Sequence, residues 1–427
     1  MAVRAGIVVT GTEVLTGRVG DRNGPWLAEA LRALGVDVGS IVVVGDRPED
    51  LRSALSFLAG SGVDLVLTTG GLRPTVDDLT AAVVGDFQGR PSALDAALEE
   101  RIAAAVARLS ARRGWRMDPT ATAAGIRKQA LVPAGATVVE PVGTAPGLVV
   151  PVADGRSGPP VLVLPGPPSE LQGMWPAAVA AEPVRAALVG ATELRQQTLR
   201  LWGTPESELA ATLRRVDEQL TGLEVTTCLR DGELEIVTRY GPDAEPGYAD
   251  LVETVRTDFA DTLFSTGPTV DGLVATALAE RGLRVAVGES CTGGLVTARL
   301  IAPPGSSAYV LGGVAAYANS AKERLLDVPA ELLATHGAVS PEVAVALAEG
   351  AAARFGADLG VGVTGIAGPG GGTADKPVGT VHLAVVGAEG PVTKSVVLPG
   401  SRDAVRQRTT TLALHLMRQL LLGGPPA

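Results

Sequence analysis

Cysteine is scarce in this chain. Among 427 residues only Cys228 and Cys291 are cysteines, and they lie too far apart for a disulfide framework or a zinc knuckle. So few cysteines are typical of proteins that work in a reducing compartment. Long apolar runs are also lacking: the first one is interrupted by Thr10 and Glu13 before it reaches the length of a signal peptide core. We therefore expect a cytoplasmic protein with no membrane partner.

Aromatic and basic residues are equally sparse. Phe, Trp and Tyr make up 3% of the chain, whereas hydrophobic residues make up 46%, which predicts aliphatic cores in layered helix and sheet domains. The 36 Lys and Arg against 46 Asp and Glu give a net charge of -10. This balance argues against a nucleic acid partner, because phosphate binding needs clustered cations.

What the chain does contain is three regions with different patterns. Residues 1–180 alternate strand and helix patterns, from RAGIVVT to DLVLTTGG, which predicts a parallel sheet covered on both faces, with ligands at the carboxyl ends of the strands. Residues 190–265 predict a small α+β domain with a hairpin at Asp231-Gly232. Residues 266–427 form a second α/β region. The expected fold class is α/β: two three-layer α/β domains with a small α+β domain between them.

The stretch GESCTGG, residues 288–294, follows one predicted strand and precedes a helix. Backbone N–H groups at a helix start suit a phosphate or an oxyanion. The turn would also expose Ser290 at the strand end, in the manner of a nucleophile elbow. The alternative is that a Ser or Thr of this turn merely caps the helix.

A second stretch, YANSAKERLL, places a lysine at the start of another helix. A strand is expected to end near Tyr317, and Ser320 with Glu323 would form a capping box. Lys322 would then lie in the first helical turn, where the helix dipole lowers the pKa of an amine and makes it a base for a serine. The alternative is a solvated surface lysine.

A third stretch, VGVTGIAGPGGG, runs from a strand into a glycine-rich turn between Thr364 and Gly372. So many glycines let the backbone approach a ligand closely. No catalytic pairing of histidine with serine or cysteine is readable. We therefore expect Cys291 to pack inward, and we interpret the three histidines as structural: His336, His382 and His415.

The N-terminal region has its own polar cluster. Two segments follow the first and third predicted strands, GTEVLTGRVGDRN and LTTGGLRPTVDDLT. Glycines followed by carboxylates and threonines suit a phosphate held beside a metal, with Asp77 and Asp78 as metal ligands. The alternative is that both aspartates cap the next helix. The candidate site residues are Glu13, Asn23, Gly70, Gly71, Thr75, Asp77 and Asp78.

The motifs ESCTGG, YANSAK, GAVSPEVA and TGIAGPGGGTADKPVGTV, in this order, resemble the C-terminal domain of the competence/damage-inducible CinA family, the nicotinamide mononucleotide amidohydrolases. The resemblance implies conversion of nicotinamide mononucleotide to nicotinate mononucleotide and ammonia in pyridine nucleotide salvage, without a cofactor. It implies Ser290 as nucleophile, activated by Tyr317 and Lys322. Gly288 stands where many relatives have alanine, and this difference is expected to matter little. The residues expected to bind substrate are Thr292, Gly293, Gly294, Asn319, Thr364, Gly370 and Gly371.

The N-terminal motifs resemble the first domain of the same family, which is similar in fold to the molybdopterin-binding proteins MoaB, MogA and MoeA. For some members this domain is an ADP-ribose pyrophosphatase that needs a divalent metal. The resemblance makes Glu13, Asp77 and Asp78 candidates to hold that metal or its water. Arg73 occupies a position that is usually glycine, where it would either crowd the turn or contact phosphate.

Three possible functions thus remain open. The first is a nucleotide-salvage amidase with a second activity on ADP-ribose, and the second is a non-catalytic pterin- or nucleotide-binding regulatory protein linked to competence or DNA damage. Ammonia release distinguishes these two, because a binding module would give none. The third is a molybdenum-cofactor synthesis enzyme, which predicts tight molybdopterin binding by the isolated N-terminal domain. The resemblance also implies a homodimer.

Overall fold

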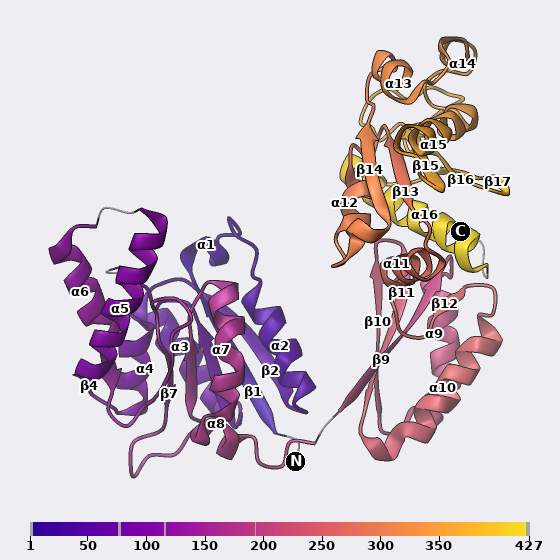
Figure 1. Ribbon diagram of the computed structural model, residues 1–427. Coiled ribbons are helices and arrows are strands. Elements are labelled where there is room, and N and C mark those ends of the chain that lie inside the picture. The colour runs from indigo at the N-terminus through magenta and orange to yellow at the C-terminus, as the bar shows by residue number, and fades with distance from the viewer. Residues whose placement is uncertain (1–2, 76–77, 115–116, 193, 424–427) are drawn as a thin grey trace. The chain divides into compact units, whose positions relative to one another are not determined.

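The computed structural model describes residues 3–75, 78–114, 117–192 and 194–423. The chain divides into two units, one ending at Arg195 and the other beginning at Gln196, and each is described by itself (Figure 1). Within the described ranges, none of the helices combines the length and the hydropathy that a bilayer crossing requires.

The first unit contains a mixed six-stranded sheet in the order β2-β1-β3-β8-β7-β6. The strands β2, β1, β3 and β8 are parallel, whereas β7 and β6 are each antiparallel to their neighbour. The prediction of a parallel sheet is therefore right for the first four strands and wrong for the last two. The strand bounds are β1 Arg4–Thr10, β2 Asp37–Val44, β3 Leu65–Thr69, β6 Thr137–Val139, β7 Gly147–Val150 and β8 Val161–Leu164.

Helices cover both faces of this sheet, which confirms three layers. Apolar residues of α2, α7 and α8 pack on one face, and those of α3 and α4 pack on the other, each with its own aliphatic core. The sequence produces this because the strands are apolar on both sides. The helix bounds are α1 Thr12–Leu15, α2 Asn23–Ala33, α3 Pro48–Gly60, α4 Thr80–Gln88, α5 Ala96–Arg113, α6 Pro119–Gln129, α7 Pro168–Ala180 and α8 Glu182–Ala187, with the short strands β4 Ser92–Leu94 and β5 Leu131–Pro133 beside α5 and α6.

The second unit begins with a four-stranded sheet in the order β10-β11-β9-β12. The hairpin between β10 and β11 turns at Asp231 and Gly232, whose φ angles of 51° and 93° are both positive. A two-residue turn of this kind was predicted from the Asp-Gly pair and is confirmed. The elements are β9 Arg195–Trp202, α9 Glu206–Arg215, β10 Leu223–Arg230, β11 Glu233–Tyr240, α10 Glu245–Asp258 and β12 Leu263–Ser265.

A five-stranded sheet in the order β14-β13-β15-β16-β17 completes the second unit. Strands β14, β13 and β15 are parallel, so their carboxyl ends share one edge, while β16 and β17 are antiparallel. One face carries α11, α12 and α16, and the other carries α13, α14 and α15. The bounds are α11 Val270–Arg281, β13 Val285–Glu289, α12 Leu295–Ile301, β14 Val310–Ala315, α13 Asn319–Leu326, α14 Ala330–His336, α15 Pro341–Phe355, β15 Leu359–Gly365, β16 Thr380–Gly387, β17 Gly390–Val397 and α16 Arg402–Leu422.

Helix α15 lies directly on this sheet because the strands present glycines to it. A Cβ atom on Gly288 would come within 2.5 Å of the Leu347 carbonyl oxygen, and one on Gly362 would overlap the Ala344 carbonyl. No real side chain tolerates such a distance to a backbone atom. The expectation that alanine at position 288 changes little is therefore wrong for this backbone.

Helix α16 joins the two sheets of the second unit. His415 is fully buried, stacks on Trp202 with ring centroids 4.0 Å apart, and shares a 2.9 Å hydrogen bond with Glu233 of β11. The Nε atom of Arg418 donates to its other ring nitrogen at 3.4 Å. Burial lowers the pKa of His415 and outweighs the pull of Glu233 in the opposite direction. The structural interpretation of this histidine is confirmed.

Candidate functional site

The three C-terminal motifs meet at the shared edge of β13, β14 and β15. The Ser290 N–H donates to the Val363 carbonyl at 2.9 Å, and the Ala316 N–H donates to the Glu289 carbonyl at 2.7 Å. Because these bonds join neighbouring strands at their carboxyl ends, Ser290, the segment from Ala316 to Tyr317, and Thr364 are placed side by side. The fold therefore assembles the polar cluster that the sequence predicts.

Ser290 opens a tight glycine turn before α12. It is 9% exposed, and no described residue hydrogen-bonds to its hydroxyl. The N–H of Gly293 donates to the Ser290 carbonyl at 3.2 Å, and Gly293 and Gly294 have φ angles of 63° and 102° that favour glycine. The N-cap of α12 is Gly294, without a side-chain cap. The interpretation of a Ser or Thr of this turn as the helix cap is therefore wrong.

The start of α12 is already bonded to an anion within the chain. The Glu289 carboxylate accepts from the N–H groups of Gly294, Val296 and Thr297 at 2.9, 3.1 and 2.9 Å. These groups were expected to serve a substrate phosphate or an oxyanion, and the structure corrects this. Sequence reasoning missed Glu289, although a carboxylate at the end of a strand and just before a glycine turn is the available signal.

Lys322 is the most unusual side chain at this edge. It is 1% exposed, and its Nζ donates to the Tyr317 carbonyl at 2.9 Å. No carboxylate of the described residues lies within 4.0 Å of it in an ion pair. Burial lowers the pKa of Lys322, partly offset by its interaction with Cys291. The direction of the shift is as expected, but desolvation is its main cause, and the alternative of a solvated surface lysine is wrong.

The predicted capping box in front of Lys322 does not form. Helix α13 begins at Asn319 with Ala318 as its N-cap, two residues earlier than the expected N-cap Ser320, and Ala318 offers no side-chain hydrogen bond. Ser320 and Glu323 therefore lie inside the helix instead of closing its start. Lys322 nevertheless remains in the first turn, because its N–H donates to the Ala318 carbonyl at 3.1 Å.

The Tyr317 hydroxyl has an arginine, and not Lys322, as its hydrogen-bond partner among the described residues. Its side chain is 66% exposed, and its hydroxyl accepts from Nη2 of Arg402 at 3.3 Å. Nη1 of Arg402 donates to the Gly368 carbonyl at 2.8 Å. Arg402 thus bridges the Tyr317 segment and the glycine-rich loop after β15. No local sequence pattern indicates this arginine, because it comes from α16, 85 residues away from Tyr317.

A second arginine of α16 holds the serine turn. Nε of Arg406 donates to the Cys291 carbonyl at 3.2 Å, and its Nη2 donates to the Thr292 carbonyl at 2.9 Å. Cys291 is 5% exposed, and burial raises the pKa of its thiol to about 12. The expectation that Cys291 packs inward is confirmed, and a thiolate nucleophile is excluded at neutral pH.

The predicted substrate-binding residues differ in their surroundings. Thr364 is 1% exposed, and its hydroxyl donates to the Ala338 carbonyl at 2.7 Å. The Thr292 hydroxyl is buried, and no residue in the described part of the chain hydrogen-bonds to it. Asn319 is exposed at the first position of α13, and Gly370 and Gly371 lie in the exposed loop between β15 and β16. Their roles with a substrate stay predictions.

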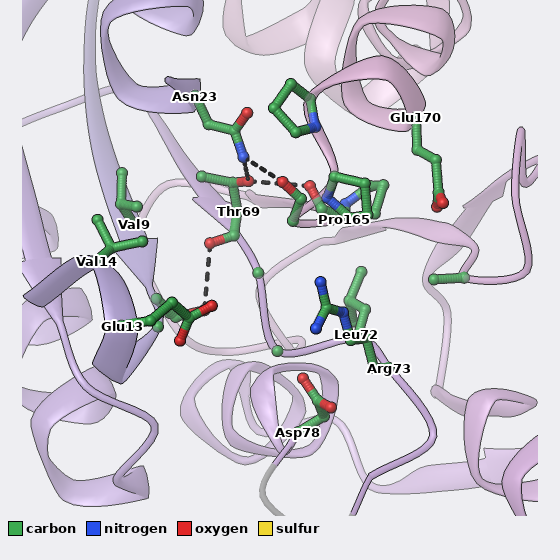
Figure 2. Close-up of a pocket in the computed structure, with 18 of the residues that line it drawn as sticks. Val9, Glu13, Val14, Asn23, Thr69, Leu72, Arg73, Asp78, Pro165 and Glu170 are labelled. Atoms are coloured by element: carbon green, nitrogen blue, oxygen red, sulfur yellow. Dashed lines mark hydrogen bonds between the residues drawn. The ribbon is translucent and has the colours of Figure 1, made fainter. Parts of the chain in front are cut away.

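The first unit contains a cavity of about 630 Å³ at the carboxyl ends of β1, β3 and β8 (Figure 2). Asp77 lies outside the described residues. The other predicted site residues all line this cavity: Glu13, Asn23, Gly70, Gly71, Thr75 and Asp78. The sequence patterns after the first and third strands therefore identified one common site.

Asn23 forms the floor of this cavity. Its amide nitrogen donates to Thr69 Oγ1 at 2.9 Å and to the Gly166 carbonyl at 2.7 Å, while the Thr69 hydroxyl donates to the Pro165 carbonyl at 3.0 Å. These partners fix the amide so that its oxygen is the free end. Asn23 Oδ1 is buried and has no hydrogen-bond partner among the described residues.

The loop after β3 presents Arg73 and Asp78 to the cavity (Figure 2). Asp78 accepts a hydrogen bond from the Thr75 hydroxyl, and α4 begins at Thr80 with no side-chain cap. The interpretation of Asp78 as a cap is therefore wrong. The backbone of Arg73 is not left-handed, so its side chain does not strain the turn. Burial raises the pKa of Glu170, and the positive charge of Arg73 partly offsets this rise.

The expected metal would need a cluster of ligand side chains at this cavity. In the described part of the chain, no group of three or more His, Cys, Asp and Glu side chains is arranged to hold a metal ion. These side chains alone therefore do not fit a protein-ligated metal. A divalent ion would need additional ligands such as phosphate oxygens, which Mg²⁺ commonly uses.

Comparison with known proteins agrees with this two-part organisation. Residues 268–421 match the model of the CinA C-terminal domain, and residues 6–184 match that of a probable molybdopterin binding domain. A CinA-like protein of Mycobacterium sp. (strain JLS) is 57% identical, covering 99% of this chain and 100% of the relative. A CinA-like protein of Mycobacterium marinum is 52% identical, covering 99% of each chain.

Solved structures are similar to parts of this chain. The competence/damage inducible protein CihA from Agrobacterium tumefaciens is 42% identical and covers 35% of this chain and 95% of its own, with a TM-score of 0.33. Full-length identity above one half, together with both domain matches, is decisive for classification. The chain belongs to the CinA-like proteins, with a molybdopterin-binding-type N-terminal domain and a CinA C-terminal domain.

Proposed function

We propose that the C-terminal domain is an amidase that hydrolyses the carboxamide of nicotinamide mononucleotide to nicotinate mononucleotide and ammonia. The observation that carries this proposal is the buried Lys322, which lacks a carboxylate partner among the described residues and lies at the same sheet edge as Ser290. A buried lysine of this kind favours its neutral form. A neutral amine beside a serine is the pair that serine-lysine hydrolases use.

The proposed reaction uses groups of this chain alone. A neutral Lys322 keeps two N–H bonds, one of which donates to the Tyr317 carbonyl, and its lone pair accepts the proton of Ser290. The serine oxygen attacks the carboxamide carbon, the tetrahedral intermediate collapses, and ammonia leaves with the proton from Lys322. Water then attacks the ester with Lys322 again as base, which releases the carboxylate and restores Ser290.

The decisive experiment measures ammonia and nicotinate mononucleotide released from nicotinamide mononucleotide. Ser290→Ala is expected to abolish turnover, whereas Cys291→Ala leaves most of it, since the Cys291 thiol stays protonated near neutral pH. Both side chains belong to the same turn, so the second variant is the matched control. An intact, folded protein without turnover would refute the proposal and favour a non-catalytic nucleotide-binding protein.

A second candidate function belongs to the first unit, where we propose a site for a phosphorylated ligand such as ADP-ribose. It is favoured by the Asn23 oxygen, a buried acceptor without a partner, and by the Arg73 side chain in the same cavity. A ribose hydroxyl would satisfy the first and a phosphate the second. A divalent ion bound with the ligand would supply phosphate charge neutralisation there.

Calorimetric titration with ADP-ribose, with and without Mg²⁺, tests this second proposal. Asn23→Ala and Arg73→Ala are each expected to weaken binding about tenfold or more, while Arg185→Ala on α8 leaves it unchanged. Release of AMP and ribose 5-phosphate would indicate a pyrophosphatase. Binding without products would favour the regulatory alternative, and no binding would refute the site.

A further inference from the structure

The carboxylate of Glu289 is completely buried and bonded only to the start of α12. Its Oε2 accepts from the N–H groups of Gly294 and Val296, and its Oε1 accepts from the N–H of Thr297 and from the Thr297 hydroxyl at 2.6 Å. Its exposed fraction is 0%, and it takes part in no ion pair of the described residues. Both oxygens are therefore committed to one short segment directly after the serine turn.

The middle of the turn, Cys291 and Thr292, is held through its carbonyl groups by a side chain of α16. Arg406 donates to the carbonyls of Cys291 and Thr292, and the Ser290 N–H is fixed to the Val363 carbonyl of β15. Groups outside the turn therefore hold residues 290 to 292, and Glu289 holds residues 294, 296 and 297. No other side chain of the described residues bonds to the carbonyls of 291 and 292.

We infer that Glu289 and Arg406 are positioning residues for Ser290, an inference that rests on the amidase proposed above. A peptide group is planar, with its C=O and N–H on opposite sides. By holding the C=O groups of residues 291 and 292, Arg406 turns the N–H groups of residues 292 and 293 to the other side of the turn. Glu289 then fixes where that turn enters α12, so the two side chains together set the orientation of the serine.

The chemistry of the carboxylate is specific. Each of the two carboxylate oxygens accepts hydrogen bonds from two donors. A glutamine cannot reproduce this, because its NH₂ group is itself a donor and would face one of these pairs of donors. Alanine at this position would leave the same donors without an acceptor and open a space the size of a carboxylate. Acetate is a small anion with the same acceptor pair, so it can occupy that space.

The test is steady-state kinetics on nicotinamide mononucleotide with Glu289→Ala, Glu289→Gln and Arg406→Lys in the full chain. Each variant is expected to lose about a hundredfold in kcat, the cost of a misplaced reacting group, while KM changes less than about threefold. Acetate is expected to restore part of the kcat of Glu289→Ala and to raise its Tm, whereas chloride at equal ionic strength does neither. The matched controls are Glu349→Ala, an exposed carboxylate on α15, and Arg408→Lys, which contacts Pro399 from the same helix.

The outcomes separate this inference from the proposed function. Unchanged kcat in Glu289→Ala, or an acetate effect equally large in Glu349→Ala, overturns the inference. If Glu289→Ala does not fold, Arg406→Lys decides, because loss of kcat at constant KM supports the inference and unchanged kcat overturns it. An inactive wild-type protein would refute the amidase, and an acetate-specific rise in the Tm of Glu289→Ala would still support the anchoring of the turn.

Discussion

At the scale of single residues, Lys322 illustrates a conflict between stability and chemistry. Its amine is buried with one carbonyl partner, which costs stability whenever the amine is protonated. We predict that Lys322→Met, of similar length, raises the free energy of unfolding by about 1 kcal/mol at neutral pH while abolishing amide hydrolysis. Thermal unfolding and the ammonia assay measure both on one sample.

The sign of this effect follows from the lowered pKa. The folded protein binds fewer protons at Lys322 than the unfolded chain does, so the penalty is full below the folded pKa and disappears above the ordinary lysine value of 10.5. The advantage of Lys322→Met should therefore shrink as pH rises. A methionine variant that is less stable at pH 7 would contradict the argument.

The same lysine determines how the rate depends on pH. Because only the neutral amine accepts the serine proton, kcat/KM is expected to rise with pH and to level off above the lowered pKa of Lys322. Lys322→Arg should be inactive throughout, since a guanidinium does not lose its proton. A pH profile of both proteins checks this, and an active arginine variant would exclude Lys322 as the base.

At the scale of elements, the contact of α15 with β13 depends on a missing side chain. We predict that Gly288→Ala destabilises the second unit by about 1–3 kcal/mol, because its Cβ forces the Leu347 carbonyl and the helix outward. Gly241→Ala is the matched control, as nothing lies within 4 Å of its Cβ position. Urea unfolding of both variants measures their stabilities. Equal unfolding midpoints would contradict the prediction, because they would mean that α15 moves away from the new Cβ at no cost in stability.

The sequence predicted much of the arrangement of helices and strands. The alternation of apolar runs and helical patterns predicted three layers in both α/β domains, and Asp231-Gly232 predicted its hairpin. Strand direction was missed for β7 and β6, because a short run of buried residues has the same pattern in either orientation. The predicted capping box does not form because α13 begins two residues earlier than expected, with Ala318 as its N-cap.

Among the candidate site residues, the sequence pointed to those in the segments that follow strands, such as Ser290 directly after β13 and Asn23 at the start of α2 after β1. It did not identify Glu289, Arg402 and Arg406 in their observed roles. Glu289 acts on N–H groups of its own neighbours, whereas the two arginines arrive from a helix that follows more than eighty residues later. Contacts of this kind depend on tertiary packing, which has no local signature.

At the scale of the second unit as a whole, stability is expected to depend on His415, which joins the two sheets. Its pKa is lowered by burial, so the unfolded chain binds the proton more readily and stability is lost as pH falls through about 6.5. Facing it are Glu233, Arg418 and Arg299. We predict that the Tm falls less between pH 7.5 and 5.5 in His415→Gln than in the wild-type protein. Parallel slopes would exclude His415 as the cause.

Helix α16 is a continuous rod on which Arg402 and Arg406 stand at one end and His415 and Arg418 near the other. At about 1.5 Å per residue, roughly 20 Å of it separates Arg402 from His415. One helix therefore contacts the serine turn through Arg406 and the four-stranded sheet through His415. A chain shortened before residue 402 would lose both contacts together, although every motif that identifies the C-terminal domain would still be present.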